Sequence, residues 1–193
     1  MSGGTGPSTD AAGWDGRSYQ ERFDRLAASG ADVHGEARFV LRWAPTSVLD
    51  AGCGTGRVAR ELARHGVGTV GVVRDPSMIG TARRLDPDLE WVLGDIGHLD
   101  LQRTFDLVVM AGNVPLFTPE GTRAALVAGC ARHLGPGGRL IAGFQLGRGY
   151  TAADYDGHCR DVGLERSGRW SSWDGDPFGD GAGYVVSLHR LPV

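Results

Sequence analysis

A run of nine residues, Val48-Leu49-Asp50-Ala51-Gly52-Cys53-Gly54-Thr55-Gly56, constrains this chain more than any other segment. Apolar residues end in an acid, three glycines follow at alternate positions, and a segment with a helical pattern begins at Arg57. Glycine adopts positive φ easily and puts no Cβ between the main chain and a ligand, and a helix start offers unpaired N–H groups. The run therefore predicts a cradle for a small molecule, in which the Asp50 carboxylate accepts a hydrogen bond from the ligand.

The spacing of the glycines excludes two common cradles. A dinucleotide-binding turn has the spacing G-x-G-x-x-G, whereas here Gly56 comes one residue early and Arg57 stands at the third glycine position. A P-loop ends in Gly-Lys-Ser/Thr, which is absent. The run from Asp50 to Gly56 resembles the first motif of class I S-adenosylmethionine (SAM)-dependent methyltransferases. The alternative interpretation is a tight strand-to-helix turn without a ligand.

Apolar segments and helical patterns alternate along the rest of the chain. Helices are predicted at 18–28, 33–43, 57–65, 77–85, 119–134 and 151–162, and strands at 47–51, 69–73, 89–93, 105–110, 139–144, 164–173 and 183–190. The glycine-rich run 135–138 is predicted to end the helix before it. Such alternation indicates a parallel sheet with helices on both faces. With the resemblance, the expected fold is α/β: a Rossmann-like three-layer α/β/α sandwich with a mostly parallel seven-stranded sheet and an antiparallel last strand.

A length of 193 residues suits one domain. We expect residues 14–193 to form it, with a helical lid at 14–45 and the sheet core at 46–193. Residues 1–13, rich in Gly, Ser and Thr, are expected to be a disordered tail and not a signal peptide.

Composition narrows the classes of partner. The net charge is −3 and no basic cluster is present, which argues against nucleic acid. No apolar run approaches the roughly 20 residues of a membrane span. The cysteines, Cys53, Cys130 and Cys159, fit neither a disulfide framework nor a zinc site, so we expect no metal and a reducing, cytoplasmic location.

The resemblance is strong over roughly 47–144 and implies SAM as the cofactor. It implies that Asp95 accepts a hydrogen bond from the adenine amino group, with the Ile96 amide nearby, and that the segment 111–113 passes the methionine moiety or the methyl group. Tyr19 is expected to wall the methyl site, with core packing as its alternative role. The residues expected to bind the cofactor are Asp50, Ala51, Gly52, Cys53, Gly54, Gly56, Val73, Asp75, Met78, Gly94, Asp95, Ile96, Ala111, Gly112, Asn113 and Tyr19.

One position departs from the family pattern. Family members usually carry Asp or Glu at the end of the second strand, where both ribose hydroxyls are bound, and this chain has Val73 there. Valine accepts no hydrogen bond, so the charge-assisted contacts of a carboxylate are missing. Asp75 either substitutes for that acid or caps the helix that starts at Pro76.

Two histidines are predicted as general bases for methyl transfer. His34 lies in the expected lid, and His158 lies on the helix after the fifth strand, one turn from Asp154. The alternative for each is a solvated surface histidine.

The sequence thus predicts an enzyme, a SAM-dependent methyltransferase acting on a small-molecule acceptor. The alternatives are a protein that binds SAM or S-adenosylhomocysteine (SAH) without turnover and, with less support, a nicotinamide-dependent oxidoreductase. The acceptor, its reacting atom and the oligomeric state stay open.

Overall fold

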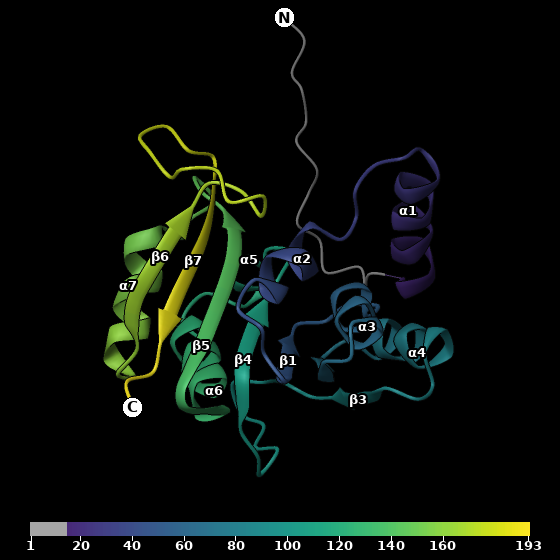
Figure 1. Ribbon diagram of the computed structural model, residues 1–193, viewed down its shortest axis with the longest axis horizontal. Helices are drawn as coiled ribbons and strands as arrows, with labels where there is room; N and C mark the ends of the chain where they lie inside the picture. Colours follow the sequence, from purple (N-terminus) through teal and green to yellow (C-terminus); the bar gives the residue numbers. More distant parts are fainter. Residues whose placement is uncertain (1–14) are drawn as a thin grey trace, which may run out of the picture.

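A computed structural model describes residues 15–193, so the predicted tail at 1–13 lies outside the described residues. Its sheet has seven strands in the order β3-β2-β1-β4-β5-β7-β6 (Figure 1). Six strands are parallel to one another, and β7 is antiparallel to both of its neighbours. The strands are β1 (Ser47–Ala51), β2 (Gly68–Val73), β3 (Glu90–Leu93), β4 (Phe105–Met110), β5 (Leu134–Gln145), β6 (Glu165–Trp170) and β7 (Tyr184–Arg190).

Helices cover both faces of this sheet, which confirms the predicted three-layer α/β/α sandwich. One face packs against α2 and α3 through a core that includes Phe39, Leu62 and Val109. The other face packs against α6 and α7 through a core that includes Cys130, Phe144 and Tyr155. The helices are α1 (Gly16–Ala28), α2 (Gly35–Leu41), α3 (Arg57–Arg64), α4 (Pro76–Leu85), α5 (Val114–Phe117), α6 (Arg123–Arg132) and α7 (Ala152–Asp161).

The strand order reverses between β1 and β4. The chain moves outward from β1 through β2 to β3, and then returns to pair β4 with the other side of β1. In open sheets of this kind a ligand binds beyond the carboxyl ends of the strands at such a switch point. The glycine run follows β1 and therefore lies at this place.

The prediction of one helix over 119–134 is wrong at both ends. A separate short helix, α5, precedes the segment, and Gly121 has a φ of +84°, so α6 begins only at Arg123. The helix ends at Arg132 because Leu134 is buried and pairs with Phe105 at the start of β5. The glycine turn at 135–138 therefore lies within β5, where the register with β4 shifts, and does not end a helix.

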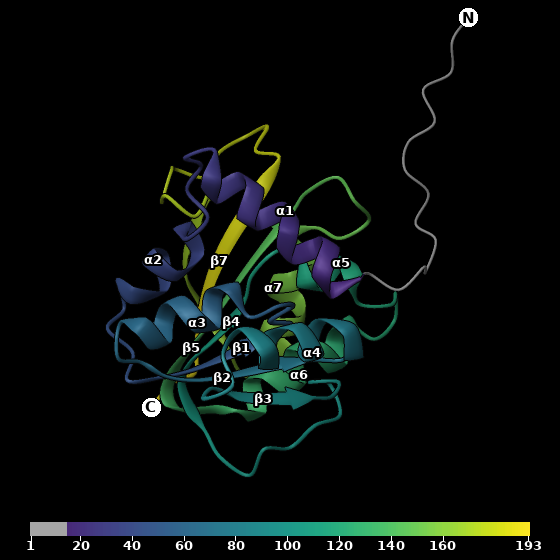
Figure 2. The ribbon, with the colours of Figure 1, turned by 90° about the vertical axis from the view of Figure 1, so that its right-hand side faces the viewer.

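The first two helices reach the same end of the molecule as the glycine run. Helix α1 packs against α4, and Figure 2 shows the two helices on the same side of the molecule. The backbone N–H of Gly16 donates to the Ser77 hydroxyl at 2.8 Å, and the Thr55 hydroxyl donates to Gln20 at 2.7 Å. No helix within residues 15–193 is both long and apolar enough to cross a membrane.

Candidate cofactor site

The glycine loop takes the left-handed backbone conformation that its composition predicts. Gly52, Gly54 and Gly56 all have positive φ, at +85°, +56° and +82°. The amides of Gly52 and Cys53 both donate to the Val72 carbonyl, at 2.8 and 3.0 Å, and this fixes the loop to the neighbouring strand β2. The main chain therefore leaves β1 in a turn that L side chains rarely adopt.

The surroundings of the three glycines differ: two are packed against side chains and one borders open space. A Cβ at Gly52 would lie 2.8 Å from Val114 Cγ1, and one at Gly56 would lie 2.8 Å from Trp91 Cζ3, so both are packed against neighbours. A Cβ at Gly54 would meet only the Tyr19 ring, at 3.7 Å. Gly54 therefore keeps open a space beyond the carboxyl end of β1.

A second bare main-chain surface follows β4. Gly112 has a φ of +69°, and a Cβ there would meet nothing within 4 Å. Because β4 pairs with β1, Gly112 and Gly54 follow the carboxyl ends of adjacent strands. Two Cβ-free turns at the switch point fit an extended ligand that lies against the backbone, as SAM does in the predicted family.

Asp50 lies inside the protein. Asp50 as a whole is only 1% exposed, and its Oδ2 accepts a hydrogen bond from the Ala59 amide of α3 at 3.1 Å. Burial raises the pKa of this carboxyl group to about 7. The group thus joins the end of β1 to the first turn of α3, and its direct contact with a ligand stays a prediction.

The raised pKa makes stability depend on pH. Because the unfolded group releases its proton near pH 4 and the folded group near pH 7, stability from Asp50 is lost as pH rises through this interval. We expect Asp50→Asn to remove this loss, a few kcal/mol in all. Urea unfolding of wild type and variant from pH 4 to pH 8 measures it as a difference. The comparison with the variant is needed because burial lowers the pKa of His189 to about 4, so His189 makes the protein more stable as pH rises and partly hides the effect of Asp50. A difference that does not change with pH would contradict the assignment.

Cys53 and Trp91 fill the space beneath the loop. Cys53 is buried, and burial raises the pKa of its thiol well above the ordinary value, which removes it as a nucleophile. The Trp91 indole lies under Gly56 and Gly71 and donates from Nε1 to the Asp86 carbonyl at 2.7 Å. Trp91 was not among the residues predicted for the site, because its pairing with Gly71 on the neighbouring strand is visible only in the folded sheet.

The end of β2 carries Val73, half-buried, in the place of the usual acid. Asp75 is the N-cap of α4: its Oδ1 accepts from the amides of Ser77, at 2.8 Å, and Met78, at 3.0 Å. Arg74 extends from the same strand end and donates to the Phe117 carbonyl of α5 at 3.1 Å. The capping interpretation of Asp75 is thus confirmed, and its role as a substitute for the missing acid stays a prediction.

The loop after β3 is fixed by its own backbone and by α6. The Gly94 amide donates to the Val73 carbonyl at 3.1 Å, and Asp95 Oδ1 accepts from the Gly97 amide at 2.9 Å. Asp95 Oδ2 lies 3.7 Å from His98 Nδ1, the Asp95 side chain is 49% exposed, and its contact with the adenine amino group stays a prediction. Ile96, in contrast, is buried, and its carbonyl packs against Gly129 of α6.

The exit of β4 is held by Asn113. This residue has a φ of +68°, its Oδ1 accepts from the Gln145 amide at 2.8 Å, and its own amide donates to the Gly143 carbonyl at 3.2 Å. Asn113 thereby connects the carboxyl ends of β4 and β5. These contacts fix the segment 111–113 at the exit of β4, and its passage beside the methionine moiety or the methyl group stays a prediction.

The two predicted bases, His34 and His158, lie in different parts of the fold. His34 precedes α2 with Nδ1 at 3.6 Å from Glu61 Oε2 of α3. His158 on α7 has Nδ1 at 2.7 Å from the Tyr150 hydroxyl, and both line a cavity of about 270 Å³ at the starts of α6 and α7. These partners of the two histidines lie outside the glycine loop, and catalysis by either stays a prediction.

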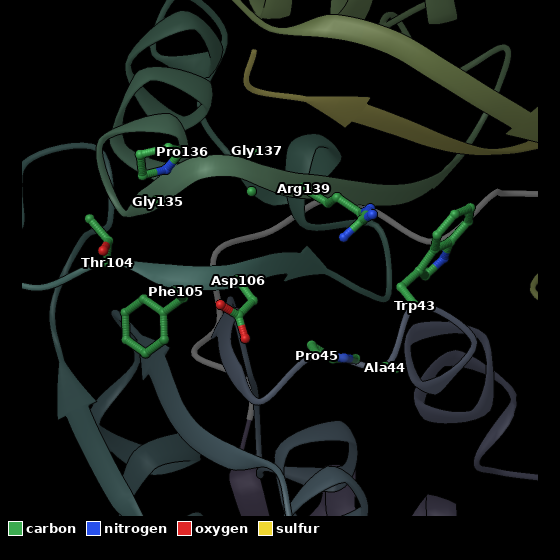
Figure 3. A pocket seen from close by; sticks show the side chains of 11 residues that line it. Trp43, Ala44, Pro45, Thr104, Phe105, Asp106, Gly135, Pro136, Gly137 and Arg139 are labelled. Carbon is green, nitrogen blue, oxygen red and sulfur yellow. The ribbon is translucent and has the colours of Figure 1, made fainter. Parts of the chain in front are cut away.

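Another surface cavity, of about 290 Å³, is lined by residues of neither the glycine loop nor the His158 cavity. It lies at the amino ends of β4 and β5, away from the carboxyl ends that the glycine loop follows, and Figure 3 shows Trp43, Asp106 and Arg139 around it. Asp106 there accepts from the Thr46 amide at 2.8 Å and its hydroxyl at 2.6 Å. Its carboxylate is thus used in holding the start of β1.

Comparison with known proteins agrees with this geometry. A family model described as a methyltransferase domain matches residues 48–138. A TehB-like SAM-dependent methyltransferase from Corynebacterium glutamicum is 38% identical, with a TM-score of 0.86 over 91% of this chain and 97% of that one.

Curated relatives match over shorter stretches. A cypemycin N-terminal methyltransferase from Streptomyces is 43% identical over 48% of this chain and 39% of its own length. A dTDP-3-amino-3,4,6-trideoxy-α-D-glucopyranose N,N-dimethyltransferase from Streptomyces venezuelae is 33% identical over 64% of this chain and 52% of its own length. The chain therefore spans about half the length, or less, of these relatives. With the glycine loop, the strand order and a solved relative matched over almost its whole length, the chain belongs to the SAM-dependent methyltransferases.

Proposed function

We propose that this protein transfers a methyl group from SAM to the nitrogen of a small-molecule amine, in the cytoplasm. Three of the curated relatives are named for methylation at an N-terminus or at an amino sugar, which supports nitrogen as the first acceptor atom to test. A trans-aconitate 2-methyltransferase from Azoarcus is also similar, at 32% identity, so carboxylic acids are the second class.

The observation that carries the proposal is the pair of Cβ-free turns at Gly54 and Gly112. When bound, SAM would supply a methyl group on a sulfonium ion: the acceptor nitrogen would bond to the methyl carbon as the carbon–sulfur bond breaks, SAH would leave, and the methylated amine would release a proton. The protein has to hold the acceptor atom roughly 3 Å from that methyl. Asn113, fixed between β4 and β5, is the residue we propose to line this position, and the Tyr19 ring over Gly54 is proposed to exclude water from it.

Titration calorimetry with SAM, SAH and NADH tests the cofactor. We expect the two sulfur ligands to bind and NADH not to bind. Val73→Asp is expected to bind SAH about tenfold more tightly, because a carboxylate restores charge-assisted hydrogen bonds to the ribose. Val73→Thr, with the same shape and no charge, is the control and is expected to resemble wild type.

The outcomes separate the alternatives. Binding of SAM or SAH by Val73→Asp but not by wild type would mean that the chain has a methyltransferase fold whose affinity for the cofactor is lost at position 73. Binding of NADH in place of the sulfur ligands would support the oxidoreductase alternative. Absence of binding to both variants and to wild type would reject the proposal.

An acceptor screen separates an enzyme from a binding protein. Wild type is incubated with SAM and sets of primary amines, amino sugars, short peptides and carboxylic acids, and SAH release is measured. Turnover with an amine class supports the proposal. Binding of SAM without turnover in any set would favour a protein that binds SAM and does not transfer its methyl group.

A further inference from the structure

Arg57 stands at the first position of α3, directly after the glycine loop, with an unusual set of partners. Its side chain is 14% exposed and forms a two-point ion pair with Glu36, with Nη1 and Nη2 at 2.8 and 2.5 Å from the carboxylate oxygens. Nη1 also donates to the Val33 carbonyl. The guanidinium lies over the Phe23 ring at 4.7 Å.

For the stability of α3 alone, its first position is unfavourable for the Arg57 cation. The first turn of a helix carries a partial positive charge, so an arginine there lowers helix stability. Burying a charge costs further free energy unless it is paired. The carboxylate of Glu36 compensates both effects. Arg57 therefore connects α3 to α2 and does not stabilise α3 itself.

These three partners of Arg57 belong to the N-terminal segment that contains α1 and α2. Phe23 lies on α1, Val33 lies between α1 and α2, and Glu36 lies in the first turn of α2. One side chain next to Gly56 therefore holds both helices against the glycine loop.

A second contact reinforces this connection. The Thr55 hydroxyl, one residue before Gly56, donates to Gln20 of α1 at 2.7 Å. Tyr19, the preceding residue of α1, has its ring beside Gly54, and the same ring lies 5.1 Å from the Phe23 ring. The place of Tyr19 above the open turn is thus coupled to the guanidinium through Phe23.

We propose that Arg57 is a positioning residue that couples the glycine loop to α1 and α2, so that α1 closes over the bound cofactor. The side chain points at Glu36 and Phe23 and has no need to touch the ligand. The inference rests on the proposed SAM site, because closure has a purpose only when a ligand lies on Gly54.

Arg57→Met keeps the length of the side chain and removes its charge and donors. We expect SAH to bind at least tenfold more weakly to this variant, and Arg57→Lys to lie between it and wild type, because one ammonium cannot make the two-point pair. Arg64→Met is the matched control. Arg64 lies on the same helix, its side chain is 64% exposed, and it pairs with Glu61 within α3, so no change in SAH affinity is expected.

Hydrogen exchange distinguishes positioning from a general loss of stability. In Arg57→Met we expect faster exchange at amides of residues 16–28, with exchange in β1 and β4 as in wild type. SAH is expected to slow exchange of α1 in wild type and to do so less in the variant. Exchange raised equally in α1 and the central strands would assign Arg57 a merely structural role.

The failures of the two proposals are distinguishable. If wild type does not bind SAH, the proposed function fails, and exchange of α1 without ligand still reports whether Arg57 holds the helix. If wild type binds SAH and Arg57→Met binds it equally well, the positioning proposal is overturned. Partial recovery of SAH affinity in the exchanged pair Arg57→Glu with Glu36→Arg would support the ion pair as the connection.

Discussion

Replacing Gly129 with alanine is expected to lower the free energy of unfolding by about 3 kcal/mol, the upper part of the range for overpacked sites. Gly129 lies within α6, where alanine is normally the better helix former by roughly 0.5–1 kcal/mol. Here the added Cβ would lie 2.7 Å from the Ile96 carbonyl carbon and 2.9 Å from Gly97 Cα. Both atoms are backbone, so neither can move without displacing the loop after β3.

Gly157→Ala provides the matched control for this expectation. Gly157 lies within α7, and an added Cβ would meet only the end of the flexible Arg160 side chain, at 3.8 Å. Urea unfolding is expected to show this variant stabilised by about 0.4–1 kcal/mol. Equal changes in the free energy of unfolding for the two variants would mean that Gly129 of α6 does not pack tightly against the loop after β3. The loop carries Asp95, so Gly129→Ala is also expected to weaken SAH binding.

Gly54→Ala is expected to weaken SAH binding at least a hundredfold while costing only about 1–2 kcal/mol of stability, the ordinary cost of a left-handed residue other than glycine. The Cβ would project into the space next to Tyr19 that the structure leaves open at the end of β1. A ligand held against the main chain cannot approach as closely once a methyl group intervenes.

Gly163→Ala separates backbone strain from ligand exclusion. Gly163 follows α7, has a φ of +80°, and would place its Cβ in open space. Both variants should lose similar stability in urea unfolding, and only Gly54→Ala should lose affinity in calorimetry. An unchanged SAH affinity in Gly54→Ala would contradict the assignment of this turn as the ligand cradle.

Local patterns predicted the elements whose ends coincide with local signals. The strands Ser47–Ala51 and Phe105–Met110 were predicted to the residue, because their apolar runs suit strands buried on both faces and glycine follows each run within two residues. The helix predicted over 119–134 was wrong because its apolar pattern continues into a strand. Only pairing with Phe105, far away in the sequence, assigns Leu134 to β5.

The same division holds at the site. The run from Asp50 to Gly56 resembles the first methyltransferase motif, and the comparison with known proteins confirms the family. The spacing did not distinguish the open turn at Gly54 from the two that pack against Val114 and Trp91. That distinction depends on side chains from β3 and α5, whose approach to the loop is set by the sheet and not by neighbouring residues in the chain.

The place of β7 in the sheet has a consequence for the order of folding during synthesis. β7 lies between β5 and β6, and it is the only described strand that β6 pairs with. While the ribosome adds Tyr184–Arg190, β5 therefore has a free edge and β6 has no place in the sheet. Since domains fold as their chain emerges, β1 to β5 can assemble early, whereas the β6 side has to wait for β7. An exposed strand edge is a template for pairing with other chains. We therefore expect a nascent chain halted before residue 184 to aggregate more readily than one in which β7 has paired with β5.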